Sequence, residues 1–467
     1  MPTDWTTFRL GNVCSKIGSG ATPRGGGSVY LAAGDVALIR SQNVYNGGFH
    51  HDGLAYLTET HAEELENVAV KAGDVLLNIT GDSVARCCQV DPEVLPARVN
   101  QHVAIIRPNP GTLDAKFLRY FLVSPGMQAD MLSWGGAGAT RNALTKGMIE
   151  AFEIPAPRDV GEQRAIAGVL GALDDKIEVN RKMARVLEGI ARAVFTSWFV
   201  DFDPVHYNIR QREHAALDRA GRFVSTGDDF SIRSAEGQLL RRGGDAVFGK
   251  IAGLFPDRLV DSPLGEVPEG WRVGTLGDVA SERRDGIAPE DIQADTAYIA
   301  LEHMPRRCIS LSDWSVADDV ASGKLVFAAG DILFGKLRPY FHKVGVAPLD
   351  GVCSTDIIVM RPKSPEWSAY ALGIASSDEF VAYTDRGSAG TKMPRTNWTD
   401  MAAYPIVVPP APLAAAYNKV VAPMIGRMIA GTHANRTLAA LRDTLLPKLI
   451  SGELRIADAE TIVGRVV

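Results

Sequence analysis

The sequence has few of the residues and patterns from which metal and nucleophilic sites are built. Its 467 residues include five cysteines and nine histidines. No two cysteines have C-x-x-C spacing, and no histidines have H-x-x-H or H-E-x-x-H spacing, so no metal site is indicated. Unpaired thiols are typical of a reducing compartment, and the first residues lack the basic start and apolar stretch of a secretory signal. We therefore expect a cytoplasmic protein with free thiols.

Long apolar runs and nucleotide-binding loops are also missing. No stretch approaches the ~18 uninterrupted apolar residues of a membrane span, so we expect no membrane association. The Gly-Lys pairs at 249–250, 323–324 and 335–336 lack the Ser or Thr that a phosphate-binding loop requires next. The net charge of −6 does not by itself indicate nucleic-acid binding, so any such function must depend on local basic patches.

What the sequence does contain is a long amphipathic segment from about 162 to 202. Apolar residues recur there in alternating steps of four and three, which is typical of a helix that lies along another helix. At 1.5 Å per residue such a helix is roughly 60 Å long. The polar Asn180 interrupts the apolar seam and would fix its register. The charged residues between seam positions, including Asp174 and Glu188, are expected to face water. The seam consists of Ile166, Leu170, Leu173, Ile177, Asn180, Ala184, Leu187, Ala191 and Val194.

The chain then repeats itself. The segment Gly73-Asp74-Val75-Leu76 returns as Gly330-Asp331-Ile332-Leu333, and Ile106-Arg107-Pro108 returns as Met360-Arg361-Pro362. A second apolar seam carries Asn435 where the first carries Asn180. Matches at a nearly constant offset of about 255 indicate internal duplication.

These patterns predict an α+β protein. Two duplicated, strand-rich mixed α/β domains are separated by two long antiparallel coiled-coil helices with pseudo-two-fold symmetry. Pro204 is expected to end the first helix, and the segment after it is expected to be only partly ordered. The expected ranges are a first domain at 1–157, a long helix at 158–204, a connector at 205–262, a second domain at 263–410, a second long helix at 411–456, and a tail at 457–467.

Several segments resemble the specificity subunit of Type I restriction–modification systems. Gly-Glu-Gln-Arg-Ala-Ile-Ala at 161–167 and Ser-Trp-Phe-Val-Asp-Phe-Asp-Pro at 197–204 are similar to the two ends of that family's central conserved helix. Residues 441–454 resemble its C-terminal conserved helix, and residues 18–23 resemble a Gly-x-Thr-Pro turn of its target recognition domains. The resemblance covers nearly the whole chain. One departure is that the second helix opens at 412–417 without the Glu-Gln-x-x-Ile start.

The resemblance implies a division of labour. Each globular domain would be a target recognition domain that reads one half of a bipartite DNA site, and the helix pair would set the spacer between the halves. Two modification subunits would bind S-adenosylmethionine and methylate adenine, while restriction subunits would cleave. The chain itself would be non-catalytic and would bind no cofactor or metal.

Candidate DNA-binding residues lie on loops that carry cations or amides and no acid of their own. Cations suit phosphates, and amides suit the edge of adenine. Preference for DNA contact over a solvated surface loop rests mainly on the resemblance. The candidates are Arg40, Gln42, Asn43, Arg141, Asn142, Lys146, Lys336, Arg338, Arg386, Lys392 and Arg395.

Two further groups have assigned roles on the helices. Asn180 and Asn435, each near the middle of its seam, are predicted to approach each other and set the register of the helix pair. The rings of Trp198, Phe199 and Phe202 form an aromatic cluster at the end of the first helix. Packing against a neighbouring domain is the favoured interpretation, and docking of a modification subunit is the functional alternative.

Two other classes of protein stay open at this stage. A coiled-coil scaffold that binds only protein is consistent with the acidic net charge, and it predicts no affinity for DNA even with the modification subunit present. A stand-alone DNA-modifying enzyme would need chemistry of its own. The D-x-K spacings at 114–116 and 174–176 fall on predicted helices without an obvious partner acid, so surface charge is the simpler explanation.

Overall fold

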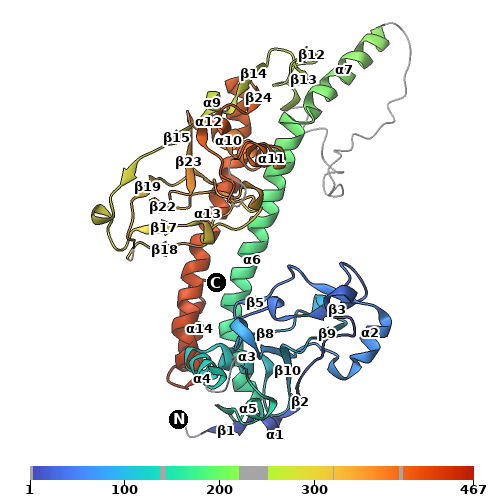
Figure 1. The fold of residues 1–467 in the computed structure, drawn as a ribbon, viewed down its shortest axis with the longest axis vertical. Coiled ribbons are helices and arrows are strands. Elements are labelled where there is room, and N and C mark those ends of the chain that lie inside the picture. The colour runs from blue at the N-terminus through green and yellow to red at the C-terminus, as the bar shows by residue number, and fades with distance from the viewer. Residues whose placement is uncertain (1–3, 137–142, 220–250, 319, 389–392) are drawn as a thin grey trace. The chain divides into compact units, whose positions relative to one another are not determined.

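A computed structural model of the chain describes residues 4–136, 143–219, 251–318, 320–388 and 393–467 (Figure 1). It divides into two compact units. Unit 1 comprises Met1–Ile177 and Thr437–Val467, and unit 2 comprises Glu178–Arg436. Two helices of 40 residues each, α6 (Val160–Phe199) and α13 (Ala411–Ile450), contribute one part to each unit. The predicted pair of strand-rich domains with two long helices is confirmed, while the six finer ranges stay a prediction.

Unit 1 combines small sheets with short helices. One sheet has the order β2-β10-β7-β8, a second has the order β6-β3-β9, and two further pairs are β1-β11 and β4-β5. The strands are β1 (Trp5–Arg9), β2 (Cys14–Ser19), β3 (Val36–Ile39), β4 (Val44–Tyr45), β5 (Gly48–Phe49), β6 (Ala55–Leu57), β7 (Val75–Asn78), β8 (Cys87–Gln89), β9 (Ala97–Val99), β10 (Val103–Pro108) and β11 (Glu153–Pro157). The helices other than α6 and α13 are α1 (Leu10–Val13), α2 (Glu59–Glu64), α3 (Ala115–Val123), α4 (Pro125–Gly136), α5 (Lys146–Glu150) and α14 (Ile456–Val463).

Unit 2 repeats this plan. Its sheets have the orders β15-β23-β20-β21 and β16-β19-β22-β17-β18, with the pairs β14-β24 and β12-β13. The strands are β12 (Leu259–Ser262), β13 (Gly265–Pro268), β14 (Arg272–Thr275), β15 (Ala280–Arg283), β16 (Gly286–Ile287), β17 (Ala297–Ile299), β18 (Ser315–Val316), β19 (Lys324–Phe327), β20 (Ile332–Gly335), β21 (Val344–Val346), β22 (Gly351–Cys353), β23 (Ile357–Pro362) and β24 (Pro405–Val408). The helices are α7 (Asp203–Arg219), α9 (Leu276–Val279), α10 (Ser368–Ala375), α11 (Asp378–Arg386) and α12 (Trp398–Ala402).

The duplicated motifs form the same ion pair in both units. Asp74 follows a glycine with φ of +85° and is 0% exposed, and Arg107 donates to its two carboxylate oxygens over 2.6 and 2.7 Å. Asp331 follows a glycine with φ of +86°, is 3% exposed, and accepts from Arg361 over 2.7 and 2.8 Å. A buried carboxylate needs such a bidentate partner, which explains why the Gly-Asp turn and the Arg-Pro strand end occur together in both units.

The two long helices run antiparallel within unit 2. Asn180 Nδ2 donates to Asn435 Oδ1 over 2.9 Å. Farther along α6, Arg427 Nε lies 3.3 Å from Met183 Sδ, and the Tyr417 hydroxyl donates to the Ala191 carbonyl over 3.3 Å. Residue numbers rise along α6 while those of their partners on α13 fall, so the two helices are antiparallel. The predicted approach of the two asparagines is confirmed. Since a buried amide needs a partner, this pair favours one register of the helices.

The expectation that Pro204 ends the first long helix was wrong, and two segments outside the long helices contain helices of their own. Helix α6 ends at Phe199, before Pro204, and the chain turns through Phe202, whose φ is +53°. Pro204 then lies in the first turn of α7, where a residue without an N–H is tolerated, so part of the supposed connector is helical. The supposed tail contains α14, whose Ala459 and Val463 are buried in the core of unit 1.

Two charged residues expected to face water instead lie in packed surroundings. Glu188 is only 8% exposed and accepts from the backbone N–H of Ile309 over 3.1 Å. Burial raises the pKa of Glu188. Asp174 accepts from Tyr120, Arg119 and Arg442 over 2.7, 2.8 and 2.8 Å. Periodicity alone could not reveal these contacts, because their partners lie far away in the sequence.

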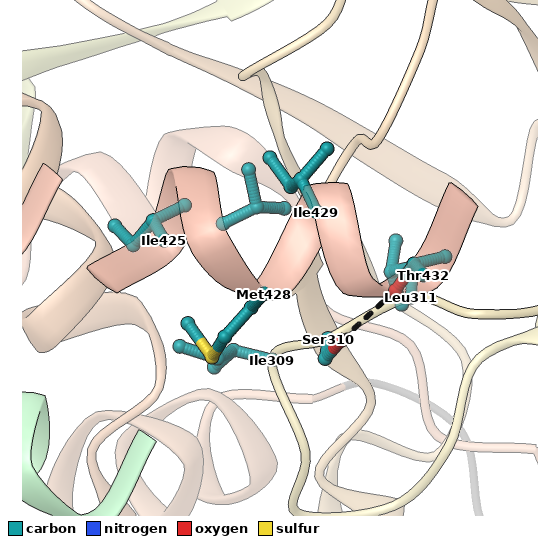
Figure 2. Close-up of a pocket in the computed structure, with 8 residues that line it drawn as sticks. Ile309, Ser310, Leu311, Ile425, Met428, Ile429 and Thr432 are labelled. Carbon is teal, nitrogen blue, oxygen red and sulfur yellow. Dashed lines mark hydrogen bonds between the residues drawn. The ribbon is translucent and has the colours of Figure 1, made fainter. Parts of the chain in front are cut away.

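The globular part of unit 2 packs directly on α13. Figure 2 shows Ile309, Ser310 and Leu311 lying against Ile425, Met428, Ile429 and Thr432 of that helix. The Ser310 and Thr432 hydroxyls lie 3.4 Å apart. The cavity between these side chains is about 10 Å³ and mostly apolar, which is too small for more than about one water. It is therefore a packing defect rather than a ligand site.

The Asp174 network predicts a large, pH-dependent cost for Asp174→Asn. Burial works to raise the pKa of Asp174, but Arg119 and Arg442 outweigh burial and lower it. Removing the charge leaves Arg119 buried without its anion, so we expect unit 1 to lose about 3 kcal/mol near pH 7. A lowered carboxyl pKa stabilises the fold above the unfolded pKa of about 3.9, and this stabilisation fades as pH falls through the folded value.

Amide hydrogen exchange in α3 and at the C-terminal end of α13 measures this loss. The difference between wild type and Asp174→Asn should narrow below about pH 4. Asp175→Asn is the matched control, because this neighbouring aspartate is exposed, and its expected effect is below about 0.5 kcal/mol. Equal protection in both variants at pH 7 would contradict the assigned role of the network.

Candidate nucleic-acid interface

Three segments distant in sequence meet at one corner of unit 1. Asn78, at the end of β7, donates from its side chain to the carbonyl of Ser41 over 2.9 Å, which ties the 40–43 turn to the strand end. Two residues after Asn78, Thr80 forms an isolated β-bridge with Ala143, which lies just before α5. We call residues 40–43, 79–83 and 143–146 the loop corner of unit 1.

The equivalent segments meet in unit 2. Lys343 donates from its side chain to the carbonyl of Leu301, and the segment after β20 forms an isolated β-bridge between Leu337 and Arg395, just before α12. The backbone N–H of Thr396 donates to the carbonyl of Lys336 over 3.1 Å. We call residues 300–303, 336–341 and 394–398 the loop corner of unit 2. Duplication therefore extends to the arrangement of the loops, and not only to the strands.

In unit 1, the three predicted residues at 40–43 have different surroundings. Gln42 is exposed, with its amide donating to the Gly53 carbonyl over 3.1 Å. Arg40 is half-buried, donates to the same carbonyl, and has its guanidinium carbon 5.3 Å from the centre of the Tyr30 ring. Asn43 is 0% exposed, and its amide donates to the carbonyls of His50 and Asp52. The prediction of a base contact for Asn43 is therefore wrong, because its side chain caps a turn.

The remaining predicted residues of unit 1 belong to the 141–146 segment. Lys146 is exposed as the first residue of α5, and its Nζ lies 3.5 Å from a carboxylate oxygen of Glu150. That acid lies one helical turn away, beyond the loop that looked free of acids. Arg141 and Asn142 lie outside the described residues.

Unit 2 brings three of its predicted cations to the loop corner. Lys336 and Arg338 follow β20, and Arg395 lies opposite them across the β-bridge. The guanidinium carbon of Arg338 is 5.7 Å from the centre of the Phe341 ring. Arg395 is not free of acids as its local sequence suggested, since its Nη2 lies 3.3 Å from Asp356 Oδ1.

Of the other two predicted cations of unit 2, one lies at the end of a helix and one lies outside the described residues. Arg386 is exposed as the last residue of α11, a helix that packs against Pro339–Phe341 of the corner. Lys392 lies outside the described residues.

Sequence reasoning missed cation–aromatic pairs beside both corners. Arg306 lies with its guanidinium carbon 4.0 Å from the centre of the Phe341 ring, and the neighbouring Tyr340 is 51% exposed. In unit 1, Arg86 lies 4.7 Å from the centre of the Tyr45 ring. Such pairs hold guanidinium groups flat and suit contacts with nucleic acid. The partners come from separate loops, so no local motif marks them.

The aromatic cluster at the end of α6 is part of the core of unit 2. Trp198, Phe199 and Phe202 are 4, 6 and 9% exposed. They pack on Phe255, Trp271 and Tyr417 with ring centres 4.9 to 5.9 Å apart. This corrects the docking alternative: the rings have almost no exposed face for a partner, and the packing interpretation accounts for them.

Neither loop corner contains an arrangement of catalytic groups that we can identify. The five cysteines are free, as expected, and burial raises the pKa of the Cys88 thiol to about 12, so it is no nucleophile at neutral pH. Across the described ranges, no three His, Cys, Asp or Glu residues are positioned to share a metal ion. Every helix within those ranges is too short or too polar to span a bilayer.

Comparison with known proteins agrees with this geometry. Residues 2–188 match the family described as "Type I restriction modification DNA specificity domain". The specificity subunit of the Type I restriction enzyme MjaIX of Methanocaldococcus jannaschii is 24% identical over 98% of this chain and 95% of its own length. That of HindI from Haemophilus influenzae is 24% identical over 97% of this chain and all of its own length. The family model thus covers the first 40% of the chain, and the two relatives that match nearly its full length are specificity subunits.

A solved structure supports the same fold. The crystal structure of a Type I restriction–modification S subunit from M. genitalium covers 95% of this chain and 96% of its own, with a TM-score of 0.51 at 13% identity. At that identity the likeness concerns the fold alone. The loop corners offer cations and amides, which are groups that can contact DNA.

The corner of unit 2 predicts a measurable electrostatic contribution to DNA binding. Replacing Lys336 and Arg395 together by glutamine should weaken binding roughly tenfold and lower the slope of log K against log salt by about 1.8, since each lost phosphate contact removes about 0.9. Filter-binding titrations at several salt concentrations, with the modification partner present, measure both quantities.

The matched control is Arg258→Gln with Arg272→Gln, which removes the same charge from exposed positions outside the corner. Its affinity should fall only slightly through the changed net charge, and its salt slope should equal that of the wild type. If the corner variant and the control have the same slope, Lys336 and Arg395 do not contact phosphates.

Proposed function

We propose that this chain is the DNA-reading subunit of a Type I restriction–modification complex, with each loop corner contacting one half of a bipartite site. The observation that carries the proposal is the convergence of the same three segments in both units, with cations at each corner and a cation–aromatic pair beside each. Two corners of equivalent construction and different sequence suit the recognition of two different half-sites.

The charges support DNA contact at the corners in spite of the acidic total. Binding depends on the cations within reach of phosphates rather than on the charge of the whole chain. Arg306, Lys336, Arg338 and Arg395 gather in unit 2, with Asp356 as the acid recorded beside Arg395. Side chains such as exposed Gln42 in unit 1 can offer hydrogen bonds to base edges.

The rest of the division of labour follows from the family. In this proposal α6 and α13 set the spacer between half-sites and bind two modification subunits. Those subunits hold S-adenosylmethionine and methylate adenine in the cytoplasm, and restriction subunits cleave. This chain holds no cofactor and performs no catalytic step.

Mapping of methylated adenines tests the proposal. DNA from cells that express this chain together with its modification partner should carry N6-methyladenine in one split motif, and DNA from cells with the partner alone should not. A complex that forms but methylates and binds without sequence preference would rule out the specificity role. It would instead favour a scaffold.

The spacer role predicts the effect of lengthening both helices. One seven-residue copy of the seam inserted after Ile177 and one after Arg436 would add about 10 Å to each helix, or about three base pairs of DNA. These positions are the junctions of the two units, so no contact within a unit is removed. The methylated motif should keep both half-sites and gain about three base pairs between them.

An insertion in α6 alone is the control. It shifts Asn180 and the seam relative to α13, so we expect loss of the folded complex or of methylation. An unchanged spacer in the double insertion, with both half-sites still recognised, would contradict the spacer role of the helices.

A further inference from the structure

A cleft of about 290 Å³ opens beside the loop corner of unit 2. This volume lies near the lower end of the range for small-ligand sites, roughly 300–1,000 Å³. Its walls come from five parts of the chain: β15 and the residue after it, β19, the segment after β20, β23 with the loop before it, and the start of α12. The cleft is therefore built by the same convergence of loops that forms the corner.

One side chain in this cleft has an unused hydrogen-bonding group. Thr396 lines the cleft and is 3% exposed, and its hydroxyl oxygen has no hydrogen-bond partner among the described residues. Buried hydroxyls are nearly always paired, so an unpaired one at a cleft points to a ligand that supplies the missing partner. The backbone N–H of Thr396 is already used, since it donates to Lys336.

The other lining residues favour a flat, partly apolar ligand. Trp398, Leu325 and Ile358 supply an aromatic and aliphatic surface. Glu282 also lines the cleft and is paired with Arg284, and Lys336 adds a second cation to the lining. The carboxylate of Glu282 can accept from the amino group of adenine or cytosine, and the two cations can pair with phosphates of the same strand. Apolar faces with a hydrogen-bonding edge are the properties of a nucleobase.

From this lining we infer that the cleft of unit 2 holds one DNA base taken out of the stack. The base lies against Trp398, with its edge toward the hydroxyl of Thr396. A stacked base pair exposes only its edge to a protein, so a concave site with an aromatic wall suits a base whose face is free. Lys336, at the rim, is placed to hold the neighbouring phosphate. The inference rests on the proposed DNA-reading function and assigns a part of it to one cleft.

Unit 1 shows that this cleft is not a general feature of the scaffold. The β-bridges at Ala143 and Arg395 align the residues that follow them. Thr145 and Asn397 both cap the next helix, so Leu144 stands where unit 2 has Thr396, and Lys146 stands where it has Trp398. The side chain of Leu144 is buried and has no hydrogen-bonding group. Differences at these positions are expected if the two units read different half-sites.

An abasic scan tests the inference in the complex of the full chain with its modification partner. Duplexes carrying the mapped methylation motif are made with one base at a time removed, and their affinities are compared by competition. For the wild type, removal of the base held in the cleft should weaken binding about tenfold, from lost stacking and hydrogen bonding. Thr396→Val should weaken binding to the intact duplex several-fold without changing the salt slope. For Thr396→Val, removal of that same base should weaken binding little further than the substitution alone.

Two variants serve as controls. Thr396→Ser keeps the hydroxyl and should behave as the wild type in the scan, which separates the hydroxyl from effects on folding. Thr399→Val makes the same change on an exposed threonine one turn along α12, outside the cleft, and should also behave as the wild type.

The outcomes separate the cleft from the wider proposal. If the wild type binds its motif but Thr396→Val gives the same abasic profile as the wild type, the base is held elsewhere and the inference fails while the proposed function stands. If Thr396→Val and Thr396→Ser lose the same affinity for every duplex, whichever base is removed, the threonine is structural and the inference also fails. If the wild-type complex shows no preference for any motif, the proposed function fails and the cleft with it.

Discussion

A helix of forty residues with an apolar seam cannot remain single in water, and most of this fold follows from that constraint. Helix α6 has buried seam residues along its length, from Ile166 in unit 1 to Ala191 in unit 2. Such a helix is roughly 60 Å long, whereas a domain of ~150 residues has a radius of gyration of about 15 Å. A second helix of equal length, α13, contributes its own apolar residues to the core of each unit. Each globular part is thereby built around two helices that the chain forms far apart in its sequence.

Polar groups within the seam decide how the two helices pair. An apolar seam alone tolerates several registers, because one leucine can replace another. Asn180 and Asn435 satisfy each other only in the observed register. Asp174 and Arg442 add an ion pair in unit 1, whereas the residues 255 positions away from them, Ile429 and Leu187, are apolar. Because the charged pair occurs in one unit only, it also distinguishes the two ends of the helix pair from each other.

The sequence could predict the features that repeat or that follow a period. Strands such as Val36–Ile39, the offset of about 255 and the two seams depend on local patterns, and the structure confirms them. The contacts of individual polar residues could not be predicted in the same way. Asn43 looked like a free amide on a loop, but carbonyls seven and nine residues away occupy it. Glu188 looked like a charge on the wet face of a helix, but it meets the backbone of Ile309, which is 121 residues away.

The same distinction separates the scaffold of each unit from its loop corner. The pairs Asp74–Arg107 and Asp331–Arg361 are nearly identical in geometry, and loss of either arginine would leave a buried carboxylate unpaired, which costs about 3–5 kcal/mol. The two corners are held by backbone bridges and by turns in which Arg40 N–H donates to Asn43 Oδ1 and Ala300 N–H donates to His303 Nδ1, so the exposed side chains take little part in holding them. Exposed side chains at the corners can therefore change at small cost to stability. A duplicated scaffold of this kind can keep its two ion pairs while its two corners diverge, which is the property that a protein with two different recognition surfaces requires.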